Sequence, residues 1–261
     1  MSDGLSLYID RQSGLHDLNP LTKLVLAGFC LISGLSLPGP LGGYILLAGV
    51  LIPLSVWGRV GKTFVSRTAK VVLPFAISVV LIQGLLWKDG TPLAGIGPIS
   101  FKLEGLRFAV AAIGRMLSVL GSFLLLSLST RPDQLMIALA QHGLSASVSY
   151  IVLTTLQIVP RFQTKARQIL DAQRARGLET EGNLVTRLRT LPALLGPLIL
   201  SSLIETEDRA IALEARAFKR PGPKTSLQIL QDSALQRTMR RLMLALFPLP
   251  VILRVVHELT K

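Results

Sequence analysis

Residues 24–58 include no charged side chain, and this run constrains the fold more than any other feature of the sequence. A helix needs about 20 apolar residues to cross a bilayer, so the run is long enough for two short helices if the chain turns in its middle. Pro38, Gly39 and Pro40 interrupt it there, and proline beside glycine is typical of turns. We therefore expect a hairpin of two membrane-spanning helices.

The overall composition agrees with a membrane protein. Hydrophobic residues make up 50% of the chain and charged residues only 16%, whereas soluble domains average about 25% charged residues. A net charge of +13 suits nucleic-acid binding in a soluble protein, but here the basic residues gather between the apolar runs. Such segments are typical of loops that face the anionic surface of a membrane. We expect an integral membrane protein that contacts the lipid bilayer and binds no nucleic acid.

Three further apolar runs are candidates for membrane spans, and they cover residues 71–87, 108–128 and 242–256. The second contains Arg115, and a charge inside a span is costly and usually faces protein or water. The third run is short and carries two prolines and Arg254. Together with the hairpin, these runs predict an all-α integral membrane protein with about five transmembrane helices.

The distribution of lysine and arginine gives an orientation. Residues 59–70 contain four basic residues and no acidic one. This indicates a cytoplasmic loop, because short cytoplasmic loops carry an excess of lysine and arginine. The N-terminus is then cytoplasmic, as is the long stretch before the last span. We expect three parts: residues 1–130 with four spans, residues 131–236 as a cytoplasmic domain, and residues 237–261 as a C-terminal transmembrane helix.

The expected cytoplasmic domain consists of two long helices that end in similar sequences. The first ends at Gly177, since glycine favours the left-handed turn after a helix, and the second stops at Pro221 and Gly222. Near their ends the helices carry DAQRARG, residues 171–177, and ALEARAF, residues 212–218. The paired motifs are Ala175, Arg176 and Gly177 in the first helix, and Ala215, Arg216 and Ala217 in the second.

An arginine at a helix end needs no partner, because the helix dipole favours a cation there by about 0.3–1 kcal/mol. Two copies with the same small neighbours favour a partner instead. An arginine flanked by alanines can enter a narrow groove and pair with a carboxylate through two hydrogen bonds. We expect Arg176 and Arg216 to dock onto a protein. Acidic residues of the second helix, Glu205, Glu207 and Asp208, are expected to pair with arginines of the first.

With these motifs the chain resembles the transmembrane T component of energy-coupling factor transporters, the group that includes the cobalt transporter subunit CbiQ and the biotin transporter subunit BioN. The resemblance extends over nearly the whole chain. It begins at LNPLTKL, where Pro20, Thr22 and Lys23 match the family's entry to its first span. It continues with Arg115 inside the fourth span, then STRP, and then the two Ala-Arg motifs as coupling motifs.

The sequence departs from the family pattern at three positions. Asn19 and Leu21 replace an acid and an arginine of the entry motif, and Ala217 replaces the glycine of the second coupling motif. Alanine enters a left-handed turn less readily than glycine. The last substitution therefore disfavours such a turn after Arg216, although the charge of the arginine is kept.

The resemblance implies a mechanical role without catalysis. A T component holds an integral-membrane, substrate-binding S component and two cytoplasmic ATP-binding-cassette (ABC) ATPases, identical or different. The resemblance implies that Arg176 and Arg216 each contact an acidic residue of one ATPase. Closure of the ATPases on ATP would move the coupling helices and reorient the S component, which releases a vitamin or a transition-metal ion inside the cell. It also implies a prokaryotic plasma (inner) membrane, no cofactor and no resident metal.

A second hypothesis is the permease subunit of a conventional ABC importer, whose docking loop DAQRARG resembles loosely. That class has one docking loop per chain, so the second motif favours the T component. An intramembrane enzyme would need paired polar catalytic groups inside its spans, and the uncharged runs contain no histidine or acidic residue. We therefore expect a subunit of an ATP-driven transporter that is not itself an enzyme.

Overall fold

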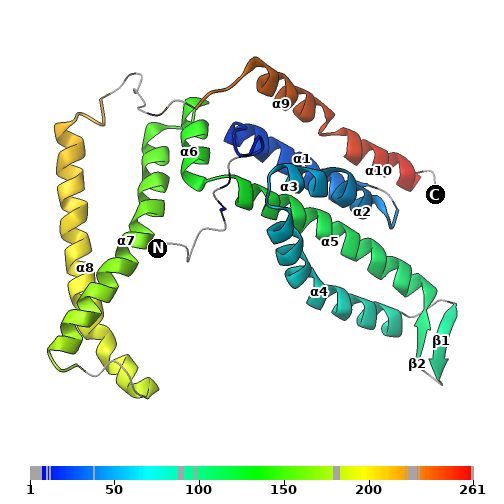
Figure 1. The fold of residues 1–261 in the computed structure, drawn as a ribbon, viewed down its shortest axis with the longest axis horizontal. Helices are drawn as coiled ribbons and strands as arrows, with labels where there is room; N and C mark the ends of the chain where they lie inside the picture. Colours follow the sequence, from blue (N-terminus) through cyan, green and yellow to red (C-terminus); the bar gives the residue numbers. More distant parts are fainter. Residues whose placement is uncertain are drawn as a thin grey trace. The chain divides into compact units, whose positions relative to one another are not determined.

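The computed structural model describes residues 8–9, 11, 13–37, 39–87, 91–96, 99–178, 183–220, 222, 228 and 230–259. The chain divides into two compact units. The hairpin unit is Ala140–Ile229, and the main unit is Asp3–Leu139 with Leu230–Lys261. Figure 1 shows the elements, which are α1 (Pro20–Ser36), α2 (Gly42–Leu46), the π-helical segment η1 (Leu47–Leu51), α3 (Ile52–Trp57), α4 (Gly61–Leu86), β1 (Pro92–Ile96), β2 (Ile99–Lys102), α5 (Leu103–Ser129), α6 (Pro132–Gln141), α7 (Ala146–Ala175), α8 (Leu184–Ala215), α9 (Ala234–Leu246) and α10 (Leu249–Leu259).

The prediction of an all-α chain is confirmed except at one two-stranded β-hairpin. Two helices are long and apolar enough to cross a bilayer, namely Gly61–Leu85 within α4 and the whole of α5. Two shorter apolar helices, Pro20–Ser36 and Gly42–Trp57, cover most of the uncharged run at residues 24–58. An antiparallel hairpin of β1 and β2 lies between α4 and α5, where no strand was predicted. The count of five spans stays a prediction.

The expected turn in the uncharged run is present, since α1 ends at Ser36 and α2 begins at Gly42. Pro38 itself lies outside the described residues. The second arm of this hairpin departs from a plain α-helix, because it passes through η1 before α3 begins. Pro53 stands in the first turn of α3 and has no N–H to donate to a preceding carbonyl, which explains the local widening of the helix.

The predicted loop at residues 59–70 is wrong as a description of structure. α4 begins at Gly61, so three of the four basic residues lie on its first turns. The sharp turn between α3 and α4 is made by Arg59, which has a φ of 54°. Neither glycine nor proline interrupts the chain between Gly61 and Pro74, so nothing separates the basic stretch from the apolar run that follows it.

Small residues let α5 approach α2 closely. A Cβ atom on Gly43 would lie 2.2 Å from the carbonyl oxygen of Gly114, so only glycine fits at this crossing. Ser118 is fully buried beside it, and its hydroxyl donates a hydrogen bond to the carbonyl of Gly43 at 2.8 Å. Membrane helices associate through such small residues, because lipid leaves no hydrophobic driving force between helices. The spacing of Gly114, Ser118 and Ser122 is the sequence signal for this face.

The C-terminal segment forms two helices where one span, residues 242–256, was expected. α9 begins after Ser233, whose hydroxyl accepts a hydrogen bond from Gln236 N at 3.3 Å. It ends at Leu246, and α10 starts at Leu249. Pro248 causes the division, since proline cannot donate the backbone hydrogen bond that would continue the helix.

The hairpin unit is built on α7 and α8, two long helices that pack against each other (Figure 1). α7 ends at Ala175, which confirms the end predicted from Gly177. α8 ends at Ala215, earlier than the stop expected at Pro221. The end of α8 is therefore set by its own cap and not by the proline.

Candidate functional site

The two predicted motifs form the C-terminal caps of α7 and α8, and the two caps share one backbone geometry. Arg176 has φ −87° and ψ 7°, and Arg216 has φ −88° and ψ 9°. The next residue is left-handed in both caps, with φ 85° at Gly177 and φ 53° at Ala217. Ala217 thus adopts the turn that we expected alanine to disfavour.

Matching hydrogen bonds close the two caps. In each cap, the N–H two residues after the arginine donates to the carbonyl three residues before the arginine, at 3.0 Å. The N–H one residue after the arginine donates to the carbonyl two residues before the arginine, at 2.9 Å. This is the Schellman arrangement that ends many helices. A left-handed alanine costs about 1–2 kcal/mol. The two hydrogen bonds and the packing of Phe218 on Tyr150, with ring centroids 5.3 Å apart, offset that cost.

Arg176 and Arg216 are exposed at the two helix ends, which we name the tips. Among the residues that the structure describes, neither guanidinium group has a hydrogen-bond or ion-pair partner. The flanking residues Ala175, Ala215 and Ala217 are exposed as well, so another surface can approach the backbone closely. Each tip can therefore accept a carboxylate through two parallel hydrogen bonds.

The tips lie at opposite ends of the hairpin unit. The antiparallel arrangement of α7 and α8 is fixed by contacts of Tyr150 with Phe218, Lys165 with Glu205 and Gln173 with Ala193. Since Phe218, just after the end of α8, packs on Tyr150 near the start of α7, the distance between the tips is close to the rise of the helix from Tyr150 to Arg176, about 40 Å at 1.5 Å per residue. The structure does not bring Arg176 and Arg216 together, so one carboxylate cannot bind both.

An ion pair connects α7 with α8 between the two tips. Lys165 Nζ lies 2.5 Å from Glu205 Oε1. The hydrogen bond from Lys165 lowers the pKa of the Glu205 carboxyl below its ordinary value. A contact between the helices was expected from the acidic residues of α8, but its partner is a lysine and not an arginine. Because water screens exposed pairs, this contact orients the helices more than it stabilises them.

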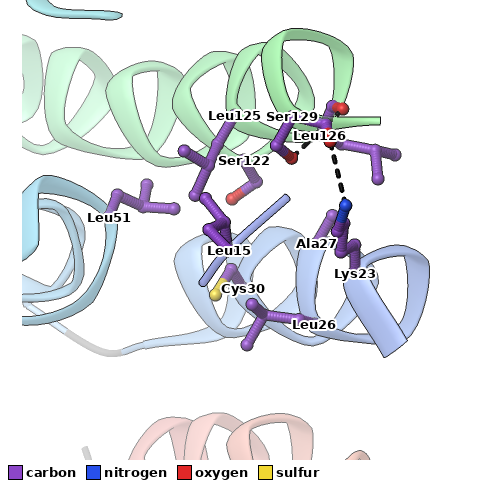
Figure 2. Close-up of a pocket in the computed structure, with 10 residues that line it drawn as sticks. All are labelled: Leu15, Lys23, Leu26, Ala27, Cys30, Leu51, Ser122, Leu125, Leu126 and Ser129. Carbon is purple, nitrogen blue, oxygen red and sulfur yellow. Dashed lines mark hydrogen bonds between the residues drawn. The ribbon is translucent and has the colours of Figure 1, made fainter. Parts of the chain in front are cut away.

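The predicted entry motif lies at the start of α1 in the main unit, where Pro20, Thr22 and Lys23 are buried. Lys23 Nζ donates to the carbonyls of Ser129, the last residue of α5, and of His16, both at 2.9 Å. Figure 2 shows Lys23 and Ser129 among the residues that line a small cavity. An ammonium group at a helix C-terminus is favourable, because the carbonyls there lack helical partners and carry the negative end of the dipole.

Arg115 lies near the middle of α5 and is partly buried. Its Nε atom is buried and has no hydrogen-bond partner within the described residues. At 1.5 Å per residue, either end of α5 is about 18 Å or more away along the axis. An arginine side chain cannot span that length, so it cannot extend its charge to the end of its own helix.

Asn19, noted above only as a departure from a family pattern, has long-range contacts in the structure. Asn19 is 2% exposed, and its Oδ1 caps α1 by accepting from Leu21 N at 3.0 Å. Its backbone N–H donates to Gln236 Oε1 at 2.9 Å, and its Nδ2 donates to the carbonyl of Gln231 at 3.3 Å. Asparagine before proline is a helix-start signal, but the two distant partners leave no trace in the local sequence.

Long apolar helices and close packing through small residues are typical of a helical membrane protein, and this chain adds a helical hairpin with exposed arginine tips. Residues 11–227 match the CbiQ family, which is described as a cobalt transport protein. The chain belongs to this family, the T component of energy-coupling factor transporters.

Several known proteins are similar over most of their length. Each bears the name energy-coupling factor transporter transmembrane protein EcfT. The protein from Thermanaerovibrio acidaminovorans is 31% identical, over 82% of this chain and 82% of its own. EcfT 1 from Listeria monocytogenes is 30% identical over 87% and 88%, and the protein from Thermosediminibacter oceani is 26% identical over 86% and 87%.

Proposed function

We propose that this chain is the non-catalytic coupling subunit of an energy-coupling factor importer in a prokaryotic plasma (inner) membrane. It connects two ABC ATPases, identical or different, with an integral-membrane S component that binds a vitamin or a transition-metal ion. The ATPases hydrolyse ATP, and this chain transmits their movement to the S component.

The observation that carries the proposal is the pair of matching caps at opposite ends of one helical hairpin. Two ATPases that face each other present the same kind of groove twice. Tips about 40 Å apart can occupy two such grooves at once. Each tip presents one exposed arginine, Arg176 or Arg216, whose planar fork suits a carboxylate in a groove.

The proposed topology follows from charge. Residues 1–130 contribute four spans, residues 131–236 form the cytoplasmic coupling domain, and residues 237–261 form the last span. The four basic residues at 59–70 support this orientation, since the excess of positive charge on the cytoplasmic side is independent of whether a loop or a helix end carries it.

In the proposed mechanism, ATP closes the ATPase pair and changes the distance between its grooves. The tips follow, because each stands at the end of a long helix. The contact of Lys165 with Glu205 keeps α7 and α8 crossed while they shift. The S component responds by turning in the membrane. Arg115, whose Nε has no partner among the described residues, would face the other helices or the S component inside the bilayer.

The first test is recovery of partners from the native host in detergent. Arg176→Glu combined with Arg216→Glu reverses the charge of both tips, and Arg167→Glu is a control at another exposed arginine of α7. We expect wild type and control to co-purify with ABC ATPases and a small hydrophobic membrane protein, and the double variant to lose only the ATPases. Losing a buried interface charge pair costs about 2–5 kcal/mol, a decrease of more than about tenfold in affinity.

Two other results would contradict the proposal. Full retention of the ATPases by the double variant would show that the tips do not dock them. Recovery of a periplasmic binding protein or of a second permease with wild type would identify a conventional importer.

A further inference from the structure

We propose that the start of α1 is a clamp that holds both chain connections between the main unit and the hairpin unit. Asn19 and Lys23 are its positioning residues. The clamp consists of Asn19 and Lys23, the end of α5 at Ser129, and the return segment at Gln231 and Gln236. It rests on the proposed function, because its role is to pass on the movement of the hairpin unit.

Lys23 holds the outgoing connection. α5 ends at Ser129, and the chain then runs through α6 into the hairpin unit. Lys23 is 4% exposed and Ser129 is 3% exposed, so their hydrogen bond of 2.9 Å is shielded from water. A buried ammonium group that loses its acceptors carries a large penalty, which makes this contact hard to open.

Asn19 holds the returning connection. The chain re-enters the main unit at Leu230, and Gln231 is bound to the Asn19 side chain one residue later. The Asn19 N–H also binds the side chain of Gln236, on the first turn of α9. Asn19 also caps α1 through its Oδ1. The position of the two N–H donors that hold the return segment is therefore set by the start of α1.

An ion pair stiffens the return segment. Arg240 Nη2 lies 2.7 Å from Asp232 Oδ2, and Arg240 Nη1 lies 3.2 Å from Asp232 Oδ1. The two side chains are only 12% and 16% exposed. A two-pronged, largely buried pair of this kind locks the approach to α9. Within the hairpin unit, Gln141 Nε2 donates to the carbonyl of Gln228 at 3.3 Å, so the outgoing and returning chains also bind each other there.

The spacing of the two positioning residues explains how they act together. Asn19 is the N-cap of α1 and Lys23 is the fourth residue of the helix, so both contacts are made at the start of one helix. Both connections are therefore attached at a single place. A movement of the hairpin unit reaches α1 through this place and is not absorbed by two independent linkers.

The test is a distance measurement by electron paramagnetic resonance on the complex of the full chain with its ATPases. Spin labels at Ile45→Cys in α2 and Gln157→Cys in α7, both exposed, report on the two units. Cys30→Ala removes the single native cysteine. The readouts are the width of the distance distribution, its shift on addition of ATP with vanadate, and the amount of bound ATPase.

Three variants separate the clamp from general stability. Lys23→Met removes the ammonium group, and Asn19→Asp keeps an acceptor for the cap but removes the donor to Gln231. Lys62→Met is the control, since Lys62 is an exposed lysine of α4. We expect Lys23→Met to widen the distribution about twofold and to abolish the ATP-dependent shift while the ATPases stay bound. Asn19→Asp should widen the distance distribution less. Lys62→Met should give the same width and the same shift as the chain with an unaltered clamp.

Unchanged widths and shifts in both Lys23→Met and Asn19→Asp would overturn the clamp. If Lys23→Met does not fold, the milder Asn19→Asp decides between the two results. A wild-type chain without bound ATPases would contradict the proposed function instead. The widths measured on the chain alone would then still decide whether Asn19 and Lys23 hold the connections.

Discussion

The second tip depends on a left-handed alanine, which limits the side chains that position 217 accepts. Alanine tolerates a φ of 53°, but a β-branched side chain in this region is a genuine outlier. We expect Ala217→Val to open the cap, displace Arg216 and lower the co-purification of ATPases several-fold, whereas Ala217→Gly keeps it. The measurement is the ratio of ATPase to this chain after purification in detergent.

Ala212→Val is the matched control for this substitution, because Ala212 is exposed inside α8 and has helical backbone. It should retain the wild-type ratio. Equal ratios for Ala217→Val and Ala212→Val would show that the backbone of the cap does not position Arg216.

Single residues were predictable where their signal is local. Arg176 and Gly177 form a helix-end pattern that the sequence displays directly, and the structure has the cap there. The left-handed Ala217 was not predictable, because its strain is offset by hydrogen bonds and by Phe218 packing on a distant tyrosine. Lys23 was recognised only as a family match, since its acceptor Ser129 is far along the chain.

The crossing of α2 and α5 depends on Gly43. An added methyl group would collide with the carbonyl of Gly114, and overpacking of this kind costs about 1–3 kcal/mol. We expect Gly43→Ala to lower the apparent melting temperature in detergent by about 2–4 °C or more. Gly49→Ala is the control in the same helical arm, because a Cβ at Gly49 meets nothing within 4 Å. Equal melting temperatures would contradict the close packing of α2 on α5.

Helices were predictable from the apolar runs, but their ends were less so. The turn between α1 and α2 follows from Pro38 to Pro40, and the end of α7 follows from Gly177. α4 begins earlier than expected, because charge alone suggested a loop where no residue breaks the helix. The β-hairpin between α4 and α5 was not predicted. The division of α9 from α10 was not predicted either, because it depends on a single proline within a short apolar segment.

Only part of the arrangement of the whole chain could be predicted from the sequence. The family was predictable, because the order of its motifs along the chain is visible in the residues. The opposite placement of the tips and the contacts of Asn19 with the return segment were not, since both arise between segments far apart in sequence. The proposed mechanism depends on these long-range contacts.

The central claim is that each arginine tip engages its own ATPase. Native mass spectrometry of the complex purified through this chain measures it most directly, because the mass gives the number of each subunit. The proposed function predicts one copy of this chain with two ATPases and one small hydrophobic membrane protein. A complex that holds only one ATPase for each copy of this chain, or none, would contradict it.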